Sequence, residues 1–342
     1  MILKTGLLGL GALITIAAAP AQAQDFYAGR QVNMLIGSGT GGGYDTYARL
    51  FIRHWPKYIP GNPTIVPQNL PAAGSLVAMN TLANSSPRDG STIGAVQNHI
   101  GVEPFMGVTG PKENAKYDGR QMNWLGSASK EYPLVVVTES SKITDFRELL
   151  QKPIIVGSSG VATSDTVYAR ILNDFVGTKF KIIDGYKDQP QLAMAMEQGE
   201  VSGRAGWFLS SVMTTQSTQL EQGKLRIIVQ VAVDKHPDLP NVPLITDFID
   251  SADKRAKLEF SLAWLPMGRP YVAPPGVPAD RVKLLRDSFM KAAKDPELLA
   301  EAKAMRLEIS PLSGEDIQAL MTRLYATPKD VVDSVRSIMV AK

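Results

Sequence analysis

The 342-residue chain contains no cysteine and only three histidines. The absence of cysteine excludes disulfides and thiolate chemistry, so the folded chain must be held by its apolar cores alone. His54, His99 and His236 are spread along the chain, which gives no support to a His-rich metal site or to a Ser/His/Asp triad. We therefore expect no bound metal, no catalytic residues and no cofactor.

Charge of one sign and long apolar runs are also scarce. The formal net charge is +3, and basic residues alternate with acidic ones through the second half of the chain, so the electrostatic signature of nucleic-acid binding is missing. The one extended apolar run, residues 6–19, follows Lys4 and ends before Ala21-Gln22-Ala23. It is shorter than the roughly 20 residues of a membrane span, although an anchor is the alternative. We predict a signal peptide over 1–23, cleaved after about Ala23, a periplasmic location, and no membrane insertion after cleavage.

Acidic residues are absent from Thr46 to Arg88. This gap argues against a dinucleotide site, although the letters Gly37-x-Gly39-x-x-Gly42 match that fingerprint, because the fingerprint requires an acidic residue about 20 positions later. A Ser-x-x-Lys sequence at 127–130 lacks the companion motifs of penicillin-recognising enzymes. An exported enzyme that acts on a carboxylate remains an alternative function.

What the sequence does contain is a strand that breaks into glycines before a helix. The apolar residues 32–36 lead into Gly37-Ser38-Gly39-Thr40-Gly41-Gly42-Gly43, and a helix is predicted to follow. Such a turn exposes unpaired N–H groups at the positive end of the helix dipole, where an anion is favoured. Residues 153–156, the small-residue stretch 157–164 and a helix predicted over 165–175 repeat this arrangement.

The alternation of strands and helices predicts an α/β protein with two lobes. The expected strands are 32–36, 64–67, 92–96, 133–137, 153–156, 180–183 and 225–231, and the expected helices are 72–82, 144–150, 165–175, 189–197, 280–294, 296–305 and 328–340. We predict lobe 1 over 24–128 plus 236–342 and lobe 2 over 129–235. Mixed sheets flanked by helices would place both small-residue turns at a cleft between the lobes.

Together these segments resemble the substrate-binding proteins of tripartite tricarboxylate transporters, the Bug or TctC family. The resemblance extends over essentially the whole mature chain, and the motifs that carry it are Gly41-Gly42-Gly43-Tyr44-Asp45-Thr46, Asn69-Leu70-Pro71-Ala72-Ala73-Gly74-Ser75, Ser86-Pro87-Arg88-Asp89-Gly90, the stretch Gly157 to Ser164, Gly223-Lys224-Leu225-Arg226, Leu239-Pro240-Asn241-Val242-Pro243 and Ala273-Pro274-Pro275-Gly276-Val277-Pro278. It implies a type II-like periplasmic-binding-protein fold that closes, like a Venus flytrap, on a small organic carboxylate.

The resemblance also implies partners and site residues. The ligand would be a dicarboxylate, a tricarboxylate or an aromatic acid, delivered to integral-membrane transporter subunits by a receptor that we expect to be a monomer. In this family the two turns hold the ligand carboxylate through backbone amides, hydroxyls and ordered water. Carried over, these residues are Gly41, Gly42, Gly43 and Asp45 in the first turn, and Ser158, Ser159, Ala162, Thr163 and Ser164 in the second.

Four further residues are candidates for specificity. Arg204, in an otherwise small and apolar strand end, would bind a second carboxylate, and the alternative is a surface or interlobe salt bridge. Trp207 would stack on an aromatic acid or belong to the core. Gln97 and Asn98 follow a strand at the ligand side, or simply form a turn. For Asp45 we favour helix capping over direct ligand contact. A chemoreceptor-linked binding protein without transport is a further alternative function.

Overall fold

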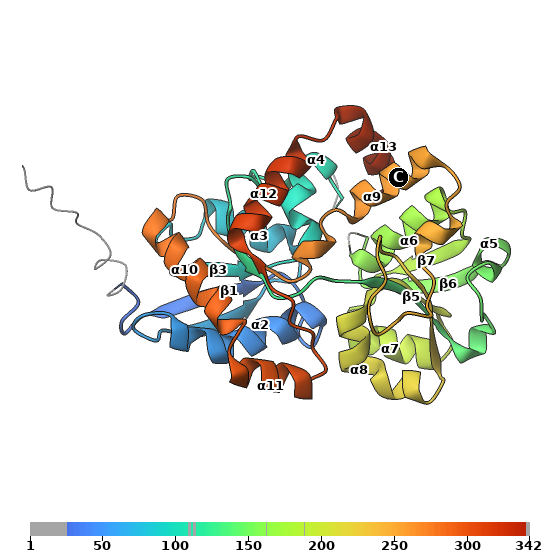
Figure 1. Ribbon diagram of the computed structural model, residues 1–342, viewed down its shortest axis with the longest axis horizontal. Helices are drawn as coiled ribbons and strands as arrows, with labels where there is room; N and C mark the ends of the chain where they lie inside the picture. Colours follow the sequence, from blue (N-terminus) through green and yellow to red (C-terminus); the bar gives the residue numbers. More distant parts are fainter. Residues whose placement is uncertain (1–25, 109–110, 112–113, 162, 188, 340–342) are drawn as a thin grey trace, which may run out of the picture.

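The computed structural model has two lobes, each built on its own β-sheet with helices on both faces (Figure 1). It describes residues 26–108, 111, 114–161, 163–187 and 189–339. The predicted leader at 1–23 lies outside these residues. None of the helices in the described part combines the length and the apolar character needed to cross a membrane. The two-lobed α/β architecture with mixed sheets confirms the predicted fold class.

Lobe 1 contains a six-stranded sheet in the order β11-β4-β10-β3-β1-β2. Strand β1 is parallel to β2 and β3, whereas β10 is antiparallel to β3 and β4. The strands are β1 (Gln31–Ile36), β2 (Thr64–Asn69), β3 (Thr92–Ala95), β4 (Asn123–Ser127), β10 (Pro270–Ala273) and β11 (Leu312–Ser313). The carboxyl ends of the parallel strands β1 and β3 therefore lie at one edge of this sheet.

Lobe 2 contains a five-stranded sheet in the order β7-β6-β8-β5-β9. Strand β6 is parallel to β7 and β8, and β5 is antiparallel to β8 and β9. The strands are β5 (Pro133–Thr138), β6 (Ile154–Ser158), β7 (Phe180–Asp184), β8 (Gly203–Phe208) and β9 (Leu225–Gln230). Strands β5 and β8 are buried along their whole length, as expected for central strands covered on both faces.

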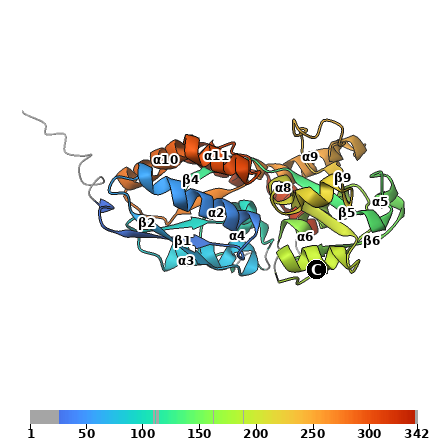
Figure 2. The same ribbon diagram turned by 90° about the horizontal axis from the view of Figure 1, so that it is seen from below.

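Helices cover both sheets (Figures 1 and 2). The α-helices are α2 (Gly43–His54), α3 (Leu76–Asn84), α4 (Glu103–Met106), α5 (Glu148–Gln151), α6 (Ser164–Phe175), α7 (Gln189–Glu197), α8 (Leu209–Glu221), α9 (Ala252–Leu262), α10 (Ala279–Ala292), α11 (Pro296–Ala304), α12 (Gly314–Tyr325) and α13 (Lys329–Met339). The 3₁₀ turns are η1 (Trp55–Tyr58), η2 (Ala73–Ser75), η3 (Asn98–Val102), η5 (Glu139–Ser141), η6 (Ile245–Phe248) and η7 (Leu265–Met267).

Most predicted elements are present within a few residues of their predicted bounds. The cap predicted for 296–305 is confirmed, because the Asp295 side chain accepts a hydrogen bond from the Glu297 amide and Pro296 is the first helical residue. The helix predicted over 144–150 is wrong: only α5 forms there. Thr144 does not cap it, since its amide and hydroxyl instead donate to the Glu148 carboxylate.

The chain crosses between the sheets at two adjacent segments, residues 128–132 and 263–269. Their backbones are hydrogen-bonded: the Ala128 amide donates to the Arg269 carbonyl at 3.0 Å, the Gly268 amide to Ser129 at 3.0 Å and the Glu131 amide to Leu265 at 3.2 Å. We name this hydrogen-bonded pair of connecting segments, 128–132 and 263–269, the hinge segment. Helix α13 packs against α6 and α9 near lobe 2 and also against α4 of lobe 1, so the C-terminal tail contacts both lobes. The predicted lobe boundaries at 128/129 and 235/236 stay a prediction.

Burial shifts the titration of one histidine in lobe 1. His99, in η3 directly after β3, is buried, and its Nε2 atom has no hydrogen-bond partner among the described residues. Removal from water disfavours the imidazolium form and lowers the pKa of His99 to about 4. The folded protein therefore holds this side chain neutral where an unfolded chain already binds a proton.

We expect His99 to make folding pH-dependent between about pH 6.5 and pH 4. Above this window His99 is neutral in both states and contributes nothing. Within it the unfolded state binds a proton that the folded state rejects, so the free energy of unfolding falls as pH falls, by on the order of 3 kcal/mol in total. The free energy of unfolding, measured by urea titration at several pH values, should depend less steeply on pH for His99→Leu than for the parent chain. An identical slope in both would contradict this assignment.

Candidate ligand-binding site

The two small-residue turns line one cavity of about 360 Å³ between the lobes. Lobe 1 contributes the turn after β1 and the end of β3, and lobe 2 contributes the turn after β6 and the end of β8. The lining residues are Ser38, Gly39, Thr40, Gly42, Gly43, Tyr44, Pro71, Ala73, Gly74, Gln97, Ser159, Gly160, Val161, Thr163, Ser164, Asp165, Lys187, Gln189, Arg204, Trp207, Phe208, Ser211 and Arg269. Three cationic side chains and one carboxylate are among them, so the cavity favours an anion.

Three helix N-termini border this cavity: α2 through Gly42 and Gly43, α6 through Thr163 and Ser164, and α8 through Phe208 and Ser211. Each of the three helices has 12 or 13 residues, and within the described residues no side chain caps any of these ends. Uncapped first-turn N–H groups and the helix dipoles direct partial positive charge to the same place. The backbone thus forms an anion-binding surface before any side chain is considered.

In the first turn, Asp45 organises the backbone. Its carboxylate accepts hydrogen bonds from the Gly41 amide at 3.0 Å, from Arg49 Nε at 2.9 Å and from Asn69 Nδ2 at 2.9 Å. Burial opposes its charge, but these three donors outweigh burial and lower the pKa of Asp45. Gly41 has a φ of +78°, a left-handed conformation suited to glycine. Asp45 therefore fixes the turn and is not among the residues that line the cavity. The capping role that we favoured for it is wrong, because the N-cap residue of α2 is Gly42 and no side chain caps this helix within the described residues.

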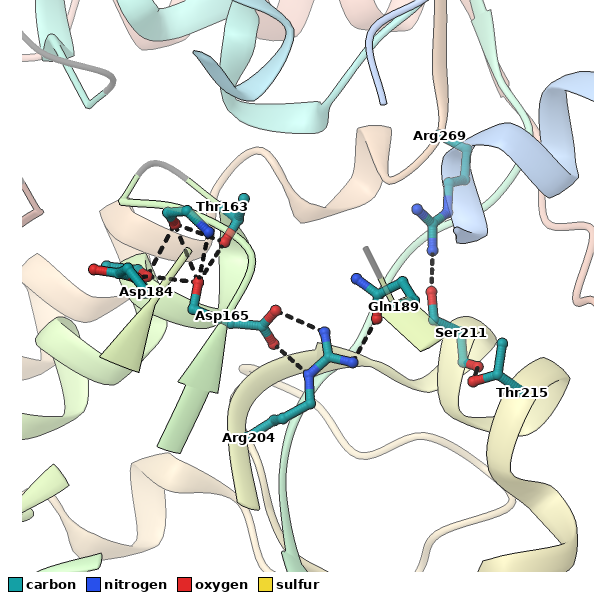
Figure 3. Close-up of polar contacts among 11 residues, drawn as sticks. Thr163, Asp165, Asp184, Gln189, Arg204, Ser211, Thr215 and Arg269 are labelled. Atoms are coloured by element: carbon teal, nitrogen blue, oxygen red, sulfur yellow. Dashed lines mark hydrogen bonds and ion pairs between the residues drawn. The ribbon is translucent and has the colours of Figure 1, made fainter. Parts of the chain in front are cut away.

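In the second turn, hydroxyls bind one another. Ser158 Oγ lies 2.8 Å from Thr163 Oγ1 and accepts from Thr166 Oγ1 at 2.7 Å, while Thr163 also donates to the Gly160 carbonyl (Figure 3). Ser158 is buried, so its hydroxyl is used within the turn and not at the cavity surface. The turn is consequently held in shape by its own side chains, with Ser159, Thr163 and Ser164 at the cavity.

Arg204 on β8 lines the cavity and is 2% exposed. Its Nε and Nη2 atoms donate to the two oxygens of Asp165 at 3.1 and 2.6 Å, and Nη1 donates to Gln189 at 2.5 Å (Figure 3). The guanidinium also lies 3.9 Å from the centre of the Trp207 ring. Burial raises the pKa of Asp165 despite this cation. All of these partners belong to lobe 2, so the ion pair lies within one lobe.

Arg269, on the hinge segment, is a second buried arginine at the cavity, and we did not predict it from the sequence. It is also 2% exposed; its Nε donates to Glu131 at 2.7 Å, and its Nη2 donates to Ser210 and Ser211 at 2.7 and 3.1 Å. Burial opposes the charge of Arg269, yet Glu131 and the phenols of Tyr44 and Tyr47 outweigh it and raise the pKa of Arg269. The same burial raises the pKa of Tyr44 to about 12.

The structure brings most of the predicted site residues to the cavity. Those that line it are Gly42, Gly43, Gln97, Ser159, Thr163, Ser164, Arg204 and Trp207. Four others, Gly41, Asp45, Asn98 and Ser158, are not among the lining residues. Ala162 lies outside the described residues. Whether any of these residues binds the ligand stays a prediction.

The sequence offered a signal for the arginine that was missed. Arg269 stands between Gly268 and Pro270, at the entrance of the apolar strand β10, which is the same isolated-charge pattern that singled out Arg204. Glu131, Lys187 and Gln189 have no comparable signal, because nothing local in the sequence distinguishes them from other polar loop residues.

Comparison with known families assigns the chain. Residues 57–333 match the sequence model of the TctC family, described as the tripartite tricarboxylate transporter family receptor. The chain belongs to this family. The members of the TctC family are periplasmic receptors and not a class of enzymes.

Relatives of this TctC receptor are distant in sequence. It is 25% identical over 303 residues to the UPF0065 protein of the TAR-I ttuE–ttuC′ intergenic region of Agrobacterium vitis, which covers 85% of this chain and 80% of that protein. A UPF0065 protein from the tcbD–tcbE intergenic region of Pseudomonas sp. strain P51 is 22% identical over 308 residues, covering 88% of this chain and 85% of that one.

Solved structures with the same fold include TctC and Bug proteins. The periplasmic binding protein BugD superposes with a TM-score of 0.72 at 18% identity, covering 91% of this chain and 99% of that one. Rhodopseudomonas palustris Rpa4515 with adipate gives 0.71 at 17% identity, covering 91% and 98%, and MatC from the same organism with bound malate gives 0.68 at 17%, covering 89% and 99%. At these identities the likeness shows the shared fold.

We expect Asp45→Asn to destabilise the TctC receptor, because the neutral amide cannot accept the three hydrogen bonds that the carboxylate accepts. The loss should be about 1–3 kcal/mol in the free energy of unfolding at neutral pH, measured by urea denaturation. Asp250→Asn, at an exposed position, is the matched control and should leave stability within about 0.5 kcal/mol of the parent. Equal stability of the two variants would exclude the role given to Asp45.

Proposed function

We propose that this receptor binds a small organic carboxylate in the cavity between its lobes and delivers it to the membrane subunits of a tripartite tricarboxylate-type transporter. The observation that carries the proposal is the meeting of three uncapped helix N-termini, from both lobes, at one cavity. Such ends bind an anion without a net formal charge of their own. The family assignment supports the receptor role.

The size of the cavity supports a small ligand. A volume of about 360 Å³ lies near the lower end of the range usual for small-molecule sites. An aliphatic di- or tricarboxylate fits this size. An aromatic acid is the second candidate, supported by Trp207 and Phe208 at the cavity wall.

Two related structures support an aliphatic diacid in particular, since one is titled with adipate and another with malate. The charged groups of this chain agree, because Arg204 and Arg269 approach the cavity from different elements. Two cations at separate points of one cavity suit a ligand with two anionic groups.

Delivery would require the lobes to close on the acid and present a joint surface to the transporter. We also propose that residues 1–23 are removed on export and that the mature receptor is a monomer. An exported enzyme with this architecture and a chemoreceptor-linked binding protein remain the alternatives. Turnover of a bound acid would favour the enzyme, and retained binding with normal uptake in a strain lacking the membrane partner would favour the chemoreceptor role.

The ligand can be sought directly on the purified protein. We expect native mass spectrometry to detect a co-purifying small acid. In a thermal-shift panel of mono-, di- and tricarboxylates and aromatic acids, at least one acid should raise the melting temperature, because a ligand at 100 times its Kd adds about 2.7 kcal/mol to stability. Amines and neutral analogues of the same size are the controls. Stabilisation by none of the acids would refute the carboxylate proposal.

Arg204 should contribute to diacid affinity. For an acid selected by the panel, isothermal titration calorimetry of Arg204→Gln should show affinity reduced about tenfold or more for the diacid, and less for the matching monoacid, since a charge-assisted hydrogen bond is lost. Substitution of Asp165→Asn in the same background removes the buried carboxylate that would otherwise lose its partner. Unchanged diacid affinity would leave Arg204 a purely structural residue.

A further inference from the structure

A buried network joins the hinge segment to the ligand cavity, and Arg269 is its centre. Glu131 and Arg269 stand on the two crossing segments, 128–132 and 263–269, and are 1% and 2% exposed. Glu131 Oε1 accepts from Arg269 Nε at 2.7 Å, from Ser210 at 2.7 Å and from Ser129 at 3.2 Å. One carboxylate therefore binds lobe 2 and both crossing segments.

The same guanidinium touches both lobes. Its Nη2 reaches Ser210 and Ser211 in the first turn of α8, and its centre lies 4.2 Å from the Tyr44 ring on α2. Helix α2 belongs to lobe 1 and α8 to lobe 2. Figure 3 shows Arg269 directed toward Ser211, beside the Arg204 cluster.

Glycine permits this close approach. A Cβ atom on Gly43 would lie 2.3 Å from Ser211 Oγ and 2.7 Å from Arg269 Nη2, and one on Gly268 would lie 2.3 Å from Glu131 Cγ. All three distances are far below contact, so a larger residue at either position would displace Ser211, Arg269 or Glu131 from the places they hold here. The packing at this point thus depends on the relative position of the lobes.

The network also forms a wall between two cavities. Arg269 and Ser211 line the ligand cavity, whereas Glu131 and Ser210 line a second cavity of about 580 Å³ at the hinge. Rotation of the lobes about the hinge segment would change the shape of both cavities, so the contacts of a group that lies between them would change as the lobes close.

We propose that Arg269 is a positioning residue that couples ligand binding to the angle between the lobes. This inference rests on the proposed function, since it takes the cavity to hold an anion. An anion in the cavity attracts the guanidinium that also binds Glu131 and the start of α8, so the ligand and the lobe arrangement share one set of donors. Arg204 provides the contrast, because its partners Asp165, Gln189 and Trp207 all lie in lobe 2.

The experiment measures the distance between the lobes. The chain has no native cysteine, so nitroxide labels can be placed at Val77→Cys in α3 and Met194→Cys in α7, which are 41% and 57% exposed. Electron–electron double resonance then gives the distribution of the interlobe distance. The hinge variant is the double substitution Glu131→Gln with Arg269→Gln, which removes both buried charges together and avoids leaving one unpaired.

Without any acid, the hinge variant should show a broader distribution shifted from the parent distance. The ratio of the parental arrangement to others should fall about tenfold or more, as for the loss of a hydrogen bond to a charged group. The matched control, Asp165→Asn with Arg204→Gln, removes an equally buried pair within lobe 2 and should keep the parental distribution. A hinge variant indistinguishable from the parent, or a control that broadens equally, would overturn the proposal.

A second arm adds malate or adipate as the probe acid. The parent should shift to a new distance at saturation, whereas the hinge variant should bind the acid by calorimetry and shift less; a full shift of the hinge variant would overturn the proposal. If neither acid binds the parent, the proposed ligand class is at fault, and the distributions without acid still decide the role of Arg269.

Two milder variants protect the test against misfolding. Ser211→Ala removes one acceptor of the Arg269 guanidinium, and Gly43→Ala places a methyl group against it without changing charge. Both should move the distribution in the same direction as the hinge variant. The single substitution Arg269→Lys, which keeps the positive charge and leaves Glu131 unchanged, should give a distribution nearer to that of the parent than the hinge variant does. Parental distributions for both milder variants would contradict the coupling.

Discussion

The burial of two arginines beside one cavity is the constraint on which the site depends. A guanidinium removed from water is costly unless a carboxylate and further acceptors compensate it. Arg204 is compensated by Asp165 and Gln189, and Arg269 by Glu131 and two serine hydroxyls. These partners fix both side chains in place, so the cavity presents ordered donors whose geometry is set before a ligand arrives.

The two ion pairs, Asp165 with Arg204 and Glu131 with Arg269, join different parts of the molecule. Asp165 stands in the first turn of α6 and Arg204 on β8, so their pair fastens a helix to its own sheet. Glu131 and Arg269 stand on neighbouring crossing segments, and their hydroxyl partners begin α8. One pair therefore stiffens lobe 2, while the other lies where the two lobes meet. The first pair holds the N-terminus of α6 through Asp165, and the second holds the N-terminus of α8 through Ser210 and Ser211.

The sequence predicted the elements that have strong local signals. The strand-to-helix turns at 37–43 and 157–164 were found because glycine and serine interrupt apolar runs, and the Asp295-Pro296 helix start because cap chemistry is local. Helix α8 was missed, since its residues 209–221 are rich in Ser, Thr and Gln and lack apolar periodicity. Strand β10 was missed because it has only four residues, the first of which is Pro270, and so short a segment carries little pattern. Because α8 was missed, Ser210 and Ser211 in its first turn were not predicted at the site.

Pairing between distant residues accounts for the rest. Arg269 and Glu131 are 138 positions apart, and Arg204 and Asp165 are 39 apart, so neither ion pair has a sequence spacing that local rules detect. Composition favours exposed pairs for such residues, and only the fold shows that these are buried. The glycines opposite them give a partial signal: Gly43 was read as a ligand contact, yet its Cβ position is filled by Ser211 and Arg269. The space around Gly43 therefore gives a second reason for glycine at this position: a side chain there would meet Ser211 of lobe 2 and Arg269 of the crossing segment, whether or not Gly43 also contacts a ligand.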